Sequence, residues 1–409
     1  MNSLQQQNET SAEPALIHAY WQKQLDQREQ NRQKRRLRTP LAIDFCSNDY
    51  LGMARALDHS EIKPNDHPFA QRMAQLAAQF SAAHGSTGSR LLSGQAQIIS
   101  ELERAIADFH QTEAALLFNS GFDANLGTLA AIGNRHTVFL YDDLCHASLI
   151  DGMRLSLSPS VFKFRHNDLK HLHELLEQHA GKTIVIVVES LYSMDGDMAP
   201  LRELAELAKQ YRAALVVDEA HSTAVFGEQG QGLTQQLGVH NDVTIRIHTY
   251  GKGMGCHGAA VVGSQTLIDY LINYARAFIY TTALPPASYA AIARAYAQLP
   301  HNQHRRTALH NVIHGFQQLR ANYDWPTLDV TWLASDTAIQ GLVIGDVART
   351  HAVTHALHAQ NLDVRPIFSP TVPAGSERLR ICLHAFNTDD EMRLLCDTLW
   401  RALSTEVQP

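Results

Sequence analysis

The chain has 409 residues, of which 45% are hydrophobic and 18% charged, enough for a large apolar core and two packed domains. Its formal net charge of −7 argues against general nucleic-acid binding, which depends on Lys and Arg neutralising phosphates. The five cysteines lack C-x-x-C spacing and the 23 histidines lack H-E-x-x-H spacing, so we expect reduced thiols and no bound metal. No signal-peptide pattern and no apolar run of about 18 residues is present, which predicts a cytoplasmic protein and neither export nor membrane insertion.

The predicted elements divide the chain into three parts. Residues 1–45 form an N-terminal arm, with a helix that starts near Pro14 and ends in the basic cluster of residues 34–38. Such a cluster is usually a solvated helix end. Residues 46–286 form a large domain in which short apolar runs alternate with helical stretches, and residues 287–409 form a smaller C-terminal domain that opens with a helix after a double proline.

Six apolar runs in the large domain are predicted to be buried strands. They are rich in β-branched residues and are separated by helical stretches, which is typical of an α/β domain with a mainly parallel sheet. In such sheets the chemistry collects at the carboxyl ends of the strands. The runs are AALLF, HTVFLY, KTIVIVVES, AALVVDEAH, VTIRIHTY and GAAVVGS.

Residues 248–260, HTYGKGMGCHGAA, allow two interpretations. Three of the glycines match G-x-G-x-x-G, but they lead into an apolar run that predicts a strand, whereas a dinucleotide-binding turn opens a helix. A Walker loop is excluded because Arg246 stands where its first glycine is required. A lysine among glycines instead suits an amine that forms a Schiff base with a bulky ring, because the glycines leave space. An isolated lysine of this kind is often only a surface residue, so the case for Lys252 depends on other positions.

Three other positions supply what a pyridoxal 5'-phosphate enzyme needs. Asp218 ends a strand, where a buried carboxylate needs a partner such as a protonated pyridine nitrogen; the alternative is a helix N-cap. His221 can bond the ring oxygen, although a single histidine of this kind is often part of the core. The turn of residues 119–125, NSGFDAN, joins a strand to a helical stretch, so its backbone N–H groups can hold a phosphate. Together with Lys252, these positions predict a pyridoxal phosphate site.

With these motifs the chain resembles the α-oxoamine synthases, a branch of the fold-type I pyridoxal phosphate enzymes. The resemblance covers about residues 44–400 and implies a large cofactor domain with a mainly parallel sheet, a smaller C-terminal α+β domain, and a homodimer with shared active sites. It rests on eight blocks in the same order, DFCSNDYLG, GSTGSRLLSG, HASL, SMDGDMAPL, DEAHSTAVFG, TYGKGMG, IYTTALPP and ERLRICL.

The resemblance assigns cofactor contacts to individual residues. Lys252 would hold the cofactor as a Schiff base and then act as the acid-base group, Asp218 would pair with the pyridinium nitrogen, and His221 with the ring oxygen. His146 would stack on the ring face. The remaining implied contacts, to the ring oxygen or the phosphate, are those of Ser193, Thr249, Gly121 and Phe122, and of Thr281 and Thr282 from the partner subunit.

Substrate contacts follow from the same resemblance. Arg380 would hold the amino-acid carboxylate, a task that suits the planar guanidinium group, with Asn48 nearby. Arg35, in the basic cluster, aligns with an arginine that contacts the acyl substrate. One position departs from the family pattern: Ala224 stands where a glycine is common, which we expect to be a packing adjustment.

The family condenses an amino acid with an acyl thioester and releases carbon dioxide and the thiol. The residues of the blocks SMDGDMAPL and IYTTALPP most resemble the branch of biotin synthesis. That branch uses L-alanine and a pimeloyl thioester of coenzyme A or acyl carrier protein. Other branches stay open: glycine C-acetyltransferase, 5-aminolevulinate synthase, serine palmitoyltransferase and autoinducer-type synthases.

Two further classes of function remain as alternatives. Some relatives are non-catalytic partner subunits that lack the lysine, whereas this chain keeps both Lys252 and Asp218. A thiol hydrolase would need one of three pairs to work together, and packed cysteines explain these thiols more simply. The pairs are Cys145 with His146, Cys256 with His257, and Cys382 with His384.

Overall fold

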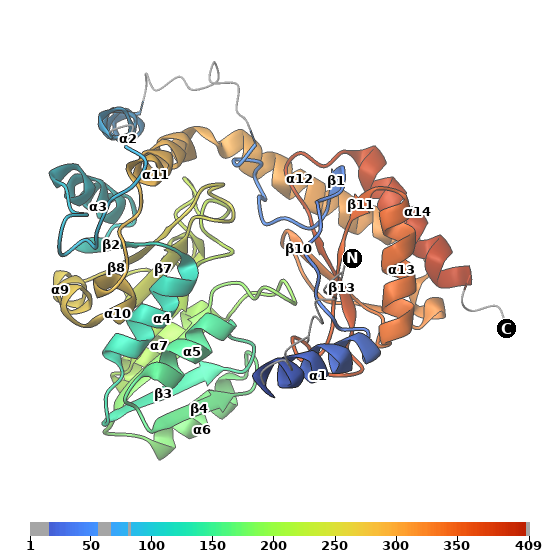
Figure 1. The fold of residues 1–409 in the computed structure, drawn as a ribbon, viewed down its shortest axis with the longest axis horizontal. Coiled ribbons are helices and arrows are strands. Elements are labelled where there is room, and N and C mark those ends of the chain that lie inside the picture. The colour runs from blue at the N-terminus through green and yellow to red at the C-terminus, as the bar shows by residue number, and fades with distance from the viewer. Residues whose placement is uncertain (1–15, 56–66, 81–82, 406–409) are drawn as a thin grey trace, which may run out of the picture.

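The computed structural model of the chain describes residues 16–55, 67–80 and 83–405. The described residues form a seven-stranded sheet, a four-stranded sheet and a two-stranded pair. Figure 1 shows the seven-stranded sheet and its helices on the left and the four-stranded sheet on the right, with α12 (Gln303–Arg320) crossing above them. The predicted fold class, a large α/β domain with a mainly parallel sheet and a smaller C-terminal α+β part, is confirmed.

All six predicted strands belong to the seven-stranded sheet, whose order is β2-β8-β7-β6-β5-β3-β4. β8 runs antiparallel to both of its neighbours, and the other strand pairs are parallel. The strand β4 was not predicted, because its central residues are exposed at the sheet edge and its run SVFKF is short. The strands are β2 (Ala114–Phe118), β3 (Thr137–Asp142), β4 (Ser160–Phe164), β5 (Thr183–Glu189), β6 (Ala214–Asp218), β7 (Ile245–Thr249) and β8 (Ala259–Gly263).

The alternation of side chains along each strand produces two apolar layers. In β5, Val185 and Val187 join one buried cluster, whereas Ile184 and Ile186 join the cluster on the opposite face. α4, α5, α9 and α10 cover the first face, and α6 and α7 cover part of the second. Burial on both faces explains why these strands are continuous apolar runs.

Three described helices of the large part precede β2 along the chain, and the others lie between or after the strands of the sheet. α2 and α11 pack against each other, and α3 packs against α2 and β2. The helices are α1 (Leu16–Gln30), α2 (Pro68–Gln79), α3 (Gln97–Phe109), α4 (Gly121–Ile132), α5 (Ala147–Leu155), α6 (Leu169–Gln178), α7 (Leu201–Tyr211), α8 (Leu233–Gln236), α9 (Gln265–Tyr274), α10 (Arg276–Ile279) and α11 (Pro286–Gln298).

The four-stranded antiparallel sheet has the order β12-β13-β10-β9, and α13 (Val347–Ala359) and α14 (Asp389–Thr405) lie beside it (Figure 1). A separate parallel pair joins β1 near the N-terminus to β11. The strands are β1 (Ile43–Asp44), β9 (Thr331–Trp332), β10 (Ile339–Val343), β11 (Leu362–Asp363), β12 (Arg365–Ile367) and β13 (Arg378–Cys382).

Two contacts bear on the division into residues 1–45, 46–286 and 287–409, which stays a prediction. The segment after β1 continues along the small sheet, since Cys382 N–H donates to the Phe45 carbonyl at 2.8 Å and Ala385 N–H to the Tyr50 carbonyl at 2.8 Å. α11, which begins at the predicted boundary, packs against α2. One apolar cluster therefore spans both sheets.

The N-terminal helix ends earlier than predicted. α1 stops at Gln30, and Arg32 has a φ of 55°, which ends the helical path before the basic cluster of residues 34–38. The predicted start near Pro14 lies outside the described residues. Among the residues that the structure describes, no helix is both long and apolar enough to span a membrane.

Candidate active site

The carboxyl ends of three parallel strands bring polar side chains together. Glu189 ends β5, Asp218 ends β6 and Thr249 ends β7, and Glu189 and Asp218 are direct neighbours in the strand register. Lys252 follows β7 by three residues, in the turn that leads to β8. The predicted meeting of acid, histidine and lysine at this sheet edge is what the structure has.

Lys252 points its amino group at His221, with 2.7 Å between Nζ and the His221 Nε2. Burial lowers the pKa of the Lys252 amine, although the charges of Asp218 and Glu189 oppose the shift. The glycines beside the lysine permit close packing, since a side chain at Gly253 would meet the Thr223 carbonyl. A lowered pKa increases the neutral fraction of the amine, which is the form that attacks an aldehyde.

Asp218 is buried and held from two directions. Its Oδ1 accepts from the Ala220 N–H at 2.8 Å, and its Oδ2 accepts from Asn125 Nδ2 at 2.7 Å. Asn125 also donates to Ser148 Oγ at 2.9 Å. Asn125 was expected only as part of the phosphate-binding turn of residues 119–125, although a polar residue on the buried side of an apolar helix was a signal for this contact. The amide donates to the carboxylate and fixes its orientation, which suits a partner such as a protonated ring nitrogen.

His146 caps the N-terminus of α5 and is exposed in the chain. Its Nδ1 lies 2.7 Å from Ser148 Oγ, and its backbone N–H donates to Glu189 Oε1 at 2.5 Å. Partial burial lowers the pKa of His146, so the imidazole is neutral near pH 7. A neutral, exposed imidazole beside Asp218 and Lys252 suits the predicted stacking on a ring.

Glu189, the last residue of β5, is a second buried acid beside Asp218. Burial, reinforced by the charge of Asp218, raises the pKa of Glu189 to about 8. Asp218, its neighbour in the strand register, accepts from Asn125 and Ala220, whereas Glu189 accepts from the His146 backbone.

The start of α4 forms a cradle for an anion. Ser120 caps the helix, and its Oγ accepts from the Asp123 N–H at 3.1 Å. A Cβ at Gly121 would collide with Thr249 Oγ1, so only glycine leaves this hydroxyl accessible beside the helix N-terminus. Free N–H groups, a hydroxyl and a positive helix end fit a phosphate. Phe122 is 47% exposed, and its predicted backbone contact with the phosphate stays a prediction.

Thr281 and Thr282 lie beside this cradle in their own chain. Asn119 Nδ2 donates to Thr281 Oγ1 at 3.0 Å and to the Thr282 carbonyl at 2.9 Å. Their predicted contact with the phosphate of a partner subunit stays a prediction.

The predicted substrate residues meet on the side of the small sheet. Arg380, on β13, donates from Nη2 to Asn48 Oδ1 at 2.9 Å and from Nε to the Ser193 carbonyl at 2.6 Å. Ser193 thus contacts Arg380 through its backbone, and its predicted bond to the ring oxygen stays a prediction. The buried guanidinium is a cation suited to a carboxylate.

Arg35 lies apart from these residues, exposed in a groove of about 310 Å³ between the N-terminal segment and β12. The groove also contains Arg32 and Arg365, and Arg365 is the cross-strand neighbour of Arg380. Lys34 and Arg36 both pair with Glu29, at 3.0 Å each. The groove is basic, but the predicted contact of Arg35 with the acyl substrate stays a prediction.

The thiols are unsuited to nucleophilic catalysis. Burial raises the pKa of Cys382 to about 11 and that of Cys256 to about 12, and that of Cys145 well above its usual value. The Cys145 thiol donates to the Val187 carbonyl and His146 bonds Ser148, so these neighbours in sequence face different partners. The geometry argues against the thiol hydrolase alternative.

Ala224 has a φ of 71°, the left-handed region that favours glycine. Its surroundings are tight, because a side chain at Gly230 would collide with the Ala224 backbone. The departure at this position is therefore a matter of backbone conformation as well as packing.

The sequence of the chain is similar to a known enzyme family over most of its length. The family model "Aminotransferase class I and II" matches residues 42–399. A relative named 8-amino-7-oxononanoate synthase from Acidithiobacillus ferrooxidans is 40% identical over 88% of this chain and 88% of its own. The chain belongs to the class I and II aminotransferase family, in its α-oxoamine synthase branch.

Two solved structures of this family are similar in fold. The 8-amino-7-oxononanoate synthase of Francisella tularensis has a TM-score of 0.71 at 26% identity, covering 89% of this chain and 98% of that one. A Sphingomonas wittichii serine palmitoyltransferase has a TM-score of 0.80 at 26% identity, covering 97% and 99%.

The α-oxoamine synthase is a pyridoxal 5'-phosphate enzyme, and its residues fit that cofactor. The Gly121 cradle suits the phosphate, Asp218 the ring nitrogen, and Lys252 the aldehyde. When bound, the cofactor supplies a ring that accepts electrons from the substrate carbon next to the nitrogen.

Proposed function

We propose that this enzyme condenses L-alanine with a pimeloyl thioester of coenzyme A or acyl carrier protein. The carbon–carbon bond to the acyl carbon forms as the thiol leaves, and the alanine carboxylate is then lost as carbon dioxide, which gives 8-amino-7-oxononanoate. The observation that carries the proposal is that Lys252, bonded to His221, lies near enough to Arg380, bonded to Asn48, for the charge of Arg380 to lower the pKa of Lys252. The 40% identity to an 8-amino-7-oxononanoate synthase over most of both chains supports this branch.

The chain's own residues account for the proton transfers that this reaction needs. Arg380 holds the carboxylate of the amino acid, which fixes the position of its α-carbon. The amine of Lys252, with its pKa lowered by burial, takes the α-proton and later returns a proton to the product. With the cofactor bound, Asp218 would hold a protonated ring nitrogen and His146 would cover the ring face.

The proposed enzyme is a homodimer. The block that contains Leu91 and Leu92 exposes both side chains, to 50% and 83%. It lies against the loop of Thr281 and Thr282, since Ala283 N–H donates to the Gly88 carbonyl at 2.9 Å. Exposed leucines next to the cradle support a subunit interface at this place. Light scattering of the purified chain tests the dimer.

The activity is tested with matched substrates. We expect mass spectrometry to detect 8-amino-7-oxononanoate when L-alanine and a pimeloyl thioester are supplied, with glycine, L-serine, acetyl and palmitoyl thioesters as controls. Faster turnover of glycine or serine would move the enzyme to another branch of the family. No product with any of these pairs would contradict the proposal.

A further inference from the structure

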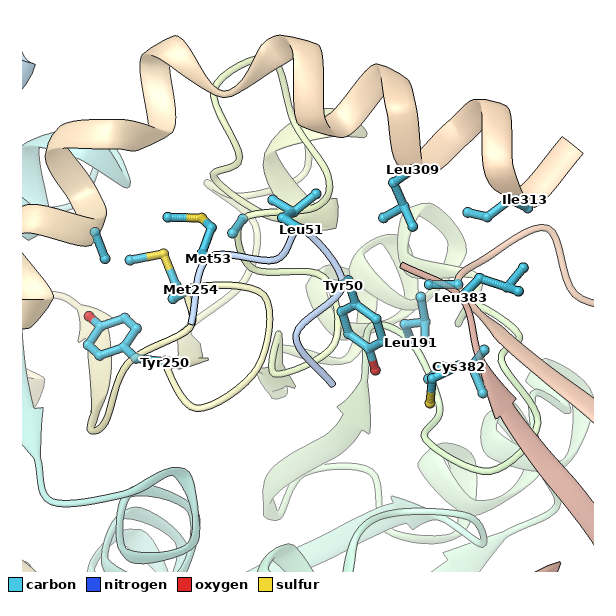
Figure 2. Packing of buried hydrophobic residues seen from close by; sticks show 14 of the residues in the cluster. Tyr50, Leu51, Met53, Leu191, Tyr250, Met254, Leu309, Ile313, Cys382 and Leu383 are labelled. Carbon is cyan, nitrogen blue, oxygen red and sulfur yellow. The ribbon is translucent and has the colours of Figure 1, made fainter. Parts of the chain in front are cut away.

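Tyr50 is buried, 1% exposed, in the segment that links the two sheets, and nothing above gives it a role. Figure 2 shows its ring beside Leu191, with Cys382 beyond Leu191 and the Tyr50 hydroxyl at the lower end of the ring. The hydroxyl donates to Asn48 Oδ1 at 3.1 Å and lies 2.7 Å from His221 Nδ1. It thus touches both a predicted substrate residue and a predicted cofactor residue.

The direction of these hydrogen bonds follows from Asn48. Its Oδ1 only accepts, and it receives bonds from Arg380 Nη2 and from the Tyr50 hydroxyl. Because the hydroxyl proton is used there, the Tyr50 oxygen accepts from a proton on His221 Nδ1. Burial keeps the pKa of His221 well below its usual value, so the ring is neutral and its Nε2 accepts from Lys252.

A bound cofactor would need the opposite hydrogen-bond direction at His221 Nε2, which would then have to donate. A negatively charged ring oxygen needs a donor, whereas His221 Nε2 acts as an acceptor towards Lys252. A neutral histidine can donate from Nε2 only if its Nδ1 gives up the proton and accepts a bond. The hydroxyl that lies at Nδ1 is that of Tyr50, and it can turn from Asn48 to His221.

We propose that Tyr50 is a positioning residue whose hydroxyl selects the tautomer of His221 and so links the substrate pair of Arg380 and Asn48 to the cofactor oxygen. This inference rests on the proposed function, because it takes His221 as the partner of the ring oxygen. The link is reciprocal: a hydroxyl turned towards His221 leaves Asn48 Oδ1 with Arg380 as its donor.

The test is a pH titration of the holoenzyme spectrum. The absorbance of the lysine-bound cofactor changes as its imine nitrogen loses a proton, and a donor at the ring oxygen favours the deprotonated form, in which the oxygen carries more charge. Tyr50→Phe weakens that donor, so we expect the imine pKa to rise by about 0.5 to 1 unit, the size of one hydrogen bond. The control is Tyr250→Phe, which removes a buried hydroxyl bonded to Tyr296 and well apart from Tyr50 in Figure 2.

A second variant should shift the imine pKa in the opposite direction. Asn48→Leu removes the competing acceptor, so the Tyr50 hydroxyl stays with His221 and the imine pKa should fall. The other titratable groups near His221 and Lys252, namely Asp218, Glu189, His146, Arg380 and Cys382, are unchanged in Tyr50→Phe and in Asn48→Leu. We expect kcat of Tyr50→Phe to fall several-fold, with less change in the KM of the amino acid.

The outcomes separate this inference from the proposed function. If wild-type protein forms no lysine-bound cofactor spectrum, the proposed function fails. If the wild type forms it and Tyr50→Phe titrates like the wild type and Tyr250→Phe, the role of Tyr50 is wrong. Shifts of the same sign in Tyr50→Phe and Asn48→Leu would also overturn the role of Tyr50, even if either variant is less stable.

Discussion

The two halves of the candidate site are built differently. On the cofactor side, Asp218, His221 and Lys252 lie within 35 residues of one another, each at or just after the end of a strand of the large sheet. On the substrate side, Asn48 and Arg380 are 332 residues apart and meet because the N-terminal segment runs along the small sheet. The first half depends on one rigid sheet edge, and the second on packing between distant segments.

The two halves should respond differently to amino-acid substitution. The cofactor residues are fixed by backbone geometry, so their substitution should remove chemistry while leaving the fold intact. The substrate residues hold two parts of the chain together, so their substitution should alter substrate affinity and local order at once.

The largest effect is expected for Lys252→Ala, on the cofactor side. Loss of the amine removes both the attachment of the cofactor and the acid-base group, and acid-base catalysis alone contributes about 10²- to 10⁴-fold. We expect kcat/KM to fall by about 10³-fold or more, measured by product formation. The free energy of unfolding should stay within about 1 kcal/mol of the wild type. Loss of the lysine removes its packing contacts, but it also removes the desolvation cost of burying a charged amine.

The exposed Lys209→Ala is the matched control and should keep full activity. A Lys252→Ala variant with more than a tenth of wild-type activity would mean that another group moves the proton.

Arg380→Lys tests the substrate side. A lysine keeps the charge but cannot bond both the carboxylate and Asn48 in the fixed geometry of the guanidinium group. A hydrogen bond to a charged group contributes about 1.5–3 kcal/mol, so the KM of the amino acid should rise about 10- to 100-fold. Steady-state kinetics with the acyl thioester held at saturation measure it, and a change in the KM of the thioester alone would contradict the assignment.

The same contrast explains how far the sequence could predict the structure. The six strands of the large sheet were identified correctly because burial on both faces leaves continuous apolar runs. The edge strand β4 was missed because two of its five residues are exposed, and α1 ends before the basic cluster because of the left-handed backbone at Arg32. Neither feature has a clear signal in the order of residue types.

The positions of Asp218 and Lys252 at the sheet edge were predictable for the same reason as the strands that carry them, and their contacts with a cofactor stay predictions. The contacts of Asn125 and Tyr50 were missed because their partners lie 93 and 171 residues away, namely Asp218 and His221. Asn48 and Arg380 were expected from family resemblance and not from spacing. Local patterns indicate elements and strand ends, whereas contacts between distant segments follow from packing.

Glu189→Gln tests the buried acids of the cofactor side through the pH dependence of stability. Because the folded-state pKa of Glu189 is about 8, raised mainly by burial, the folded chain keeps this proton at pH values where the unfolded chain has lost it. Stability of the wild type therefore falls as pH rises from about 4.5 towards 8. Glutamine cannot ionise, so we expect the variant to gain about 1–2 kcal/mol over the wild type between pH 5 and pH 7 in urea unfolding. The exposed Glu206→Gln should show no such trend.

Arg35→Ala is expected to have the smallest effect, and it compares an exposed arginine with the buried Arg380. An exposed charge contributes less than about 1 kcal/mol, so the KM of the acyl thioester should rise less than about fivefold while the KM of the amino acid stays unchanged. The increase should shrink with added salt, because screening weakens exposed charges. The exposed Arg401→Ala on α14 is the control. A rise above about tenfold would mean that the groove closes over the acyl group during turnover, and Arg35 would then belong with Arg380 as a buried substrate contact.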